Sequence, residues 1–117
     1  MDHLTVAQEK LFQSPFGQLA CKIPSAKQQM EIARRTQFYA GGLPLAAQDW
    51  DLAEAMARLD VLIVQEPAEF VKDKNANAWD YDKIYDTEAL IKLGKEIGEW
   101  VGSFRKSVRT EQGEVGA

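Results

Sequence analysis

The last helix predicted from this sequence carries three glycines at a spacing of four residues, in the stretch LGKEIGEWVGSF. Each glycine inside a helix costs about 1 kcal/mol relative to alanine, because its backbone loses more conformational freedom on folding. On a helical wheel Gly94, Gly98 and Gly102 lie on one side, beside an apolar seam that contains Leu90 and Ile97. The missing side chains let another backbone come close, so the pattern predicts tight packing along this side.

Two kinds of neighbour fit the glycine side. The non-polar arc of the helix covers about 200°, whereas a helix packed on one core needs little more than about 100°. One neighbour can use the apolar seam, and a second can lie along the glycines. The second neighbour is either another helix of the same chain or a separate subunit or partner protein. The candidate self-association or partner surface consists of Ile91, Gly94, Gly98, Trp100 and Gly102.

A first helix is predicted to begin after Ser25, which is a good N-cap. Gln28, three residues later, completes a capping box. The helix runs to about Ala40, where Gly41 and Gly42 end it because glycine adopts the left-handed conformation of a C-cap. Four residues supply its apolar surface: Met30, Ile32, Ala33 and Phe38.

A second helix is predicted to begin between Gln48 and Asp51 and to run to Glu66, where Pro67 ends it. The stretch VLIV within it also fits a strand, but the continuous helical pattern before it favours the helix. The third helix opens at Asp86 or Thr87 and runs to about Val108. The core face of the second helix consists of Leu52, Met56, Leu59, Leu62 and Ile63.

The polar connection over residues 67–86 contains four aromatic residues that are expected to attach it to the helices, and a short helical turn is expected after Asp80. The aromatic residues are Phe70, Trp79, Tyr81 and Tyr85.

The N-terminal residues show the alternation of a half-buried strand at Leu19, Cys21 and Ile23, and Leu11 and Phe12 can supply a partner strand. The predicted fold is mainly α, a small domain of three to four helices with a short N-terminal β-hairpin as an optional element. It forms a single helical domain over residues 1–108, in which residues 1–24 are an extension or a hairpin. Residues 109–117 are predicted to form a flexible tail.

No residue pattern in the chain predicts catalysis, a metal site or a cofactor. With one cysteine and one histidine, the chain cannot form an internal disulfide or a closed Cys/His zinc site. Asp73, Asn75 and Asn77 match the first ligands of an EF-hand loop, but Ala78 replaces the turn glycine and Ile84 the last glutamate. Cys21 is expected to be a buried apolar residue. The sequence therefore predicts that the protein is not an enzyme.

The charge and hydropathy of the chain bear on its partners and its location. The net charge of −4 argues against binding to bare nucleic acid, which requires clustered lysine and arginine. No apolar run approaches the roughly 18 to 20 residues that span a bilayer, and the N-terminus does not resemble a secretory signal. A cytoplasmic protein that does not bind membranes is expected.

Three segments occur in an order that resembles the small tail assembly chaperones of long-tailed, siphovirus-type bacteriophages. The opening segment is IPSAKQQMEIARRTQFYAGGLPL, the second is ARLDVLIVQEPAEF, and the last is DTEALIKLGKEIGEWVGSFRK. Together they fall within about residues 19–106. Each segment by itself is a packing pattern, and the order and spacing carry the resemblance.

The resemblance implies a non-enzymatic assembly factor that acts in the host cell cytoplasm and is absent from the mature virion. Its partners would be the tape measure protein, which is long and largely helical, and the tail tube protein. Self-association into a homo-oligomer would let many copies coat one partner. The alternative is a structural phage protein of the virion, such as a head–tail connector.

Overall fold

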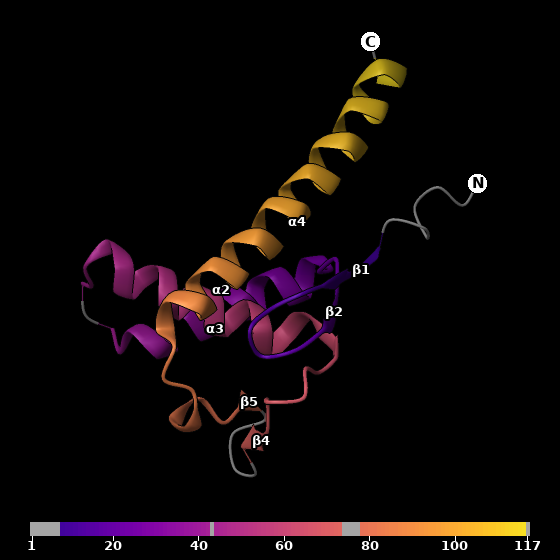
Figure 1. The fold of residues 1–117 in the computed structure, drawn as a ribbon. Coiled ribbons are helices and arrows are strands. Elements are labelled where there is room, and N and C mark those ends of the chain that lie inside the picture. Colours follow the sequence, from indigo (N-terminus) through magenta and orange to yellow (C-terminus); the bar gives the residue numbers. More distant parts are fainter. Residues whose placement is uncertain (1–7, 43, 74–77, 117) are drawn as a thin grey trace.

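The computed structural model describes residues 8–42, 44–73 and 78–116, with only the backbone described for residues 109–116. Three α-helices and five short strands lie within this part of the chain (Figure 1). The elements in chain order are β1 (Glu9–Phe12), β2 (Leu19–Lys22), α2 (Ala26–Ala40), α3 (Ala47–Leu62), β3 (Ile63–Gln65), β4 (Lys72–Asp73), β5 (Ala78–Trp79), the 3₁₀ helix η1 (Tyr81–Lys83) and α4 (Thr87–Gly116).

The prediction of a mainly α domain is wrong, because two antiparallel sheets make the fold a mixed α/β domain. One sheet has the strand order β1-β2-β3, and the other is the pair β4-β5. The second helix was expected to continue to Glu66, but α3 ends at Leu62 and the chain enters β3. Residues 63–65 instead form main-chain hydrogen bonds with β2. The β-branched residues of VLIV favour this extended conformation.

The three-stranded sheet has one face buried in the core. In the hairpin, Phe12 pairs with Leu19, and both side chains are buried. Cys21 pairs with Ile63 of β3 and is also buried, as expected. The turn between β1 and β2 is closed by a 3.0 Å hydrogen bond from the Gly17 N–H to the Ser14 carbonyl.

Helix α2 confirms the predicted caps. The Ser25 hydroxyl accepts from the Gln28 N–H at 3.2 Å, and the Ser25 N–H donates to the Gln28 side chain at 2.9 Å. Gly41 takes a left-handed conformation with φ of 71° at the C-cap. Of the four residues predicted to supply its apolar surface, only Ile32 is buried; Met30, Ala33 and Phe38 face outward.

The core lies between α3, α4 and the three-stranded sheet. Leu59 and Leu62 of α3 and Leu90 and Ile97 of α4 are fully buried in it. The aromatic residues of the connection behave differently from one another. Phe70 and Trp79 are buried and Tyr81 packs against the core, whereas Tyr85 is 87% exposed, so it does not attach the connection to the core as expected. The predicted helical turn after Asp80 is confirmed as η1.

Helix α4 extends well beyond the rest of the fold (Figure 1). Its 30 residues correspond to about 45 Å of helix, close to the 48 Å longest dimension of the molecule. The helix opens after Asp86, whose carboxylate accepts from the Ala89 N–H at 3.1 Å. Its backbone remains helical through residues 109–116, beyond the predicted end of the helix near Val108.

In the part of the chain that the structure describes, no helix has both the length and the apolar character needed to cross a membrane.

Cys21 is expected to be unreactive in the folded protein. Its side chain is inaccessible, and burial raises the pKa of the thiol to about 12, so almost none of it is the nucleophilic thiolate at pH 8. The thiol reagent DTNB should therefore react with native protein only as fast as the protein unfolds, and completely in concentrated urea. Rapid stoichiometric reaction of native protein would contradict the buried position of β2.

Candidate functional site

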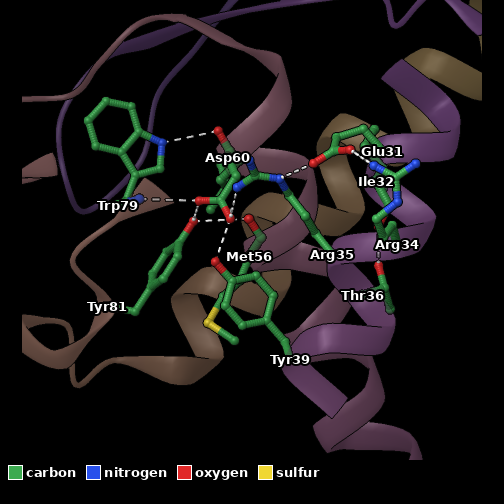
Figure 2. Close-up of polar contacts among 11 residues, drawn as sticks. Glu31, Ile32, Arg34, Arg35, Thr36, Tyr39, Met56, Asp60, Trp79 and Tyr81 are labelled. Atoms are coloured by element: carbon green, nitrogen blue, oxygen red, sulfur yellow. Dashed lines mark hydrogen bonds and ion pairs between the residues drawn. The ribbon is translucent and has the colours of Figure 1, made fainter. Parts of the chain in front are cut away.

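A buried carboxylate, Asp60, lies at the centre of a polar network between the helices and the connection (Figure 2). Its side chain is entirely inaccessible to solvent. Four groups donate hydrogen bonds to it: the Arg35 guanidinium at 3.2 Å, the Tyr39 hydroxyl, the Trp79 main-chain N–H at 3.3 Å and the Tyr81 hydroxyl at 2.8 Å.

The network joins three parts of the fold. Asp60 belongs to α3, Arg35 and Tyr39 to α2, and the other two donors to β5 and η1. Two further contacts fasten the connection to α3. The Trp79 indole donates to the Leu59 carbonyl at 3.1 Å, and the Tyr81 hydroxyl also lies 3.0 Å from the Met56 carbonyl.

The geometry of Asp60 suits a structural cross-link. A carboxylate that is inaccessible and already accepts hydrogen bonds from four donors has no room to bind substrate or receive a proton from it. Burial, and next the neighbouring Asp60, raise the pKa of the Tyr39 and Tyr81 hydroxyls well above the usual value near 10. Both phenols therefore remain protonated donors at neutral pH.

The raised tyrosine pKa values predict a loss of stability at alkaline pH. The folded state keeps both phenols neutral, whereas the unfolded chain ionises them near pH 10, so their contribution is complete below about pH 10 and is lost as pH rises above it. Tyr39→Phe should lower the free energy of unfolding by about 1 to 2 kcal/mol at pH 7 and reduce its alkaline decline. Urea unfolding from pH 7 to 11 measures both effects.

The control for this prediction is Tyr85→Phe, which removes a hydroxyl from an exposed ring. It should leave the unfolding curve at pH 7 and its alkaline decline as in the parent protein. An alkaline decline that is equally steep in Tyr39→Phe and the parent would contradict the role of this phenol.

An open cleft of about 590 Å³ lies over the network, between α2 and the segment from β4 to η1. Its aromatic lining includes Phe38, Tyr39 and Tyr81. The Tyr39 ring packs edge to face on Phe38 and on Tyr81, with centroid distances of 5.6 Å and 6.0 Å respectively. No group of three or more potential metal ligands occurs among the residues whose side chains the structure describes, 8–42, 44–73 and 78–108. Asn75 and Asn77 of the rejected EF-hand match lie outside the described residues.

The first two glycines of the predicted surface face α3 of the same chain. A Cβ at Gly94 would lie 2.5 Å from the Ala55 Cβ, so the two helices touch there. A Cβ at Gly98 would lie 3.0 Å from the Arg58 guanidinium carbon, and Arg58 donates to the Gly94 carbonyl at 3.3 Å. Gly102 has open space where its side chain would be. The same-chain alternative therefore accounts for two of the three glycines.

The other two residues of that surface are separated from the glycine contact. Trp100 is half-buried and packs edge to face on Phe12 of β1, with ring centroids 5.7 Å apart. Ile91 is half-buried and lines a shallow groove that also contains Asp51, Lys95 and Glu99. The five predicted residues thus do not form one open surface.

Two features of the structure were missed by the sequence prediction. The Asp60 network gives only a faint signal, a carboxylate within the apolar stretch around Leu59 and Leu62. The outward position of Met30 and Phe38 was also missed, since both were assigned to the apolar surface of their helix. Their exposed fractions are 65% and 77%, which makes α2 a candidate interaction surface.

Comparison of the chain with protein-family models, curated proteins and solved structures found no match. The candidate sites are therefore interpreted from their own geometry.

Proposed function

We propose that this protein is a tail assembly chaperone of a long-tailed bacteriophage, which binds the tape measure protein and promotes assembly of the tail tube. It acts in the host cytoplasm without catalysing a reaction, and it does not remain in the virion. The resemblance of the three ordered segments supports the proposal.

The structural observation that carries the proposal is the projecting part of α4. This helix leaves the body of the molecule and projects beyond it (Figure 1). Phe104 and Val108 remain partly accessible on this part, and Gly102 leaves room for close approach. Such a surface suits a partner that is long and largely helical.

Co-purification with the tape measure protein tests the proposal. A tagged chain expressed with the tape measure protein of the same phage should hold it in a soluble complex, and mass spectrometry of purified particles should not detect the chain. Recovery of the chain as a stoichiometric component of particles would instead identify a structural protein such as a connector. Failure to bind the tape measure protein would overturn the proposal.

A variant pair tests whether α4 provides the contact. Gly102→Leu fills the open space and should weaken binding to the tape measure protein or self-association, whichever uses this side. Ser107→Leu adds the same side chain at an exposed position about 140° away around the helix and serves as the control. Gly98→Leu is unsuitable because it would strike Arg58 of the same chain. Equal binding by both variants would exclude this side of α4.

A further inference from the structure

The outward side of α2 is largely exposed among the described residues, and α4 reaches it at Gln29. Eight residues on this face are exposed, and none of them is acidic: Ala26, Lys27, Gln29, Met30, Ala33, Arg34, Gln37 and Phe38. The buried residues Ile32, Thr36 and Ala40 lie on an adjacent arc of the helix, and Ala40 is only about 20° from Ala33 at 100° per residue. The helix therefore has a second side that is largely exposed in the described structure.

The spacing on this face matches the seam of a helix pair. Ala26, Met30, Ala33 and Gln37 follow intervals of four, three and four residues, which is the interval of the a and d positions in a coiled coil. Two alanines in the seam allow a neighbouring helix to come close. Met30 provides the central apolar contact, and the exposed ring of Phe38 lies at one edge.

Positive charges outnumber negative charges beside the seam. Lys27 and Arg34 lie on one flank, and both are exposed. On the other flank Arg105 of α4 reaches over and donates to the Gln29 side chain at 2.8 Å. The adjacent carboxylate, Glu31, is already bound to Arg34 and Arg35. In a chain with 18 acidic and 14 basic residues, this local excess of positive charge is notable.

We propose that the outward face of α2 binds an amphipathic helix of a partner protein that carries carboxylates on both sides of its apolar stripe. The apolar stripe would pack on Met30 and the two alanines, and the carboxylates would pair with Lys27, Arg34 and Arg105. A second copy of α2 fits poorly, because its own Lys27 and Arg34 would meet like charges. The inference rests on this face alone and does not depend on the proposed phage function.

The direct test uses a designed peptide of three heptads, with leucine at a and d and glutamate at e and g. Its affinity for the full chain is measured by fluorescence anisotropy at low salt and again at high salt. The peptide should bind, and salt should weaken binding because the flanking pairs are exposed. Two comparison peptides, with lysine or glutamine in place of glutamate, should bind at least about tenfold more weakly.

Matched variants locate the contact. Met30→Ala, and separately Lys27→Gln combined with Arg34→Gln, should each weaken the acidic peptide at least about tenfold. Leu11→Ala is the apolar control at an exposed position on β1, and Lys83→Gln combined with Lys92→Gln is the charge control; both should bind like the parent. All changes are at exposed positions, and circular dichroism checks that each variant is folded.

Four outcomes would overturn the inference. The acidic peptide could fail to bind, or it could bind no better than the lysine and glutamine peptides. It could bind the α2 variants as well as the parent, which would place the contact elsewhere. Finally, another molecule could occupy the face. A second copy of the chain would be shown by a dimer in ultracentrifugation that Met30→Ala dissociates. Nucleic acid would be shown by binding of a duplex DNA oligonucleotide that the Lys27 and Arg34 changes abolish.

Discussion

Replacing Asp60 by asparagine is expected to lower the free energy of unfolding by about 3 kcal/mol. The change removes the charge that faces Arg35 and exchanges one acceptor oxygen for an N–H₂ group that faces other donors. Because the position is inaccessible to solvent, water cannot replace the acceptor that the buried donors lose. For a single domain with a total stability of about 5 to 15 kcal/mol, this is a large share.

Urea unfolding followed by circular dichroism measures this effect, with Asp82→Asn as the control. Asp82 is an exposed carboxylate of η1, so its replacement should change stability by less than about 0.5 kcal/mol. If Asp60→Asn does not fold, Tyr81→Phe removes a single donor of the same network and should cost about 1 kcal/mol. Equal stability of the Asp60 and Asp82 variants would show that the network does not hold the fold together.

Features fixed by a few consecutive residues were predictable from the sequence. The capping box of Ser25 and Gln28 and the left-handed Gly41 are formed as predicted, because each depends only on residues of its own turn. The turn after Asp80 is local in the same sense, since the Asp80 carboxylate accepts from the N–H of Asp82.

The end of α3 was not predictable from local pattern. The stretch VLIV suits a helix or a strand, and the choice depends on β2, where Cys21 pairs with Ile63. A partner more than forty residues away in sequence supplies the hydrogen bonds that decide the structure. This pairing adds a third strand to the hairpin and, together with the separate β4-β5 sheet, makes the fold mixed α/β and not mainly α.

The polar network was hidden from the sequence for the same reason. The four donors to Asp60 come from positions 19 to 25 residues away, in α2, β5 and η1. None of these separations is a recognisable motif. The glycine pattern predicts close packing but not the neighbour; in the structure α3 lies against Gly94 and Gly98, whereas Gly102 remains open.

Alanine substitution at the three glycines of α4 is expected to give three different results. Gly94→Ala should destabilise the protein by about 2 to 3 kcal/mol, because the new Cβ would lie 2.5 Å from the Cβ and 2.7 Å from the Cα of Ala55. Gly98→Ala should change stability by less than about 0.5 kcal/mol, since the flexible Arg58 side chain can move. Gly102→Ala should stabilise the protein by about 0.5 to 1 kcal/mol, because alanine favours helix and its Cβ would contact no other atom within 4 Å.

Thermal and urea unfolding of the three variants at equal concentration separates a same-chain contact from a subunit contact. If α3 is the neighbour, the alanine variant at Gly94 should be the most destabilised, followed by that at Gly98 and then that at Gly102. The changes in unfolding midpoint should then not depend on protein concentration. Ala55→Gly should partly restore Gly94→Ala by removing the nearer clashing atom, while the Ala55 Cα still crowds the site. Three equal stabilisations would mean that α3 and α4 do not meet at this point.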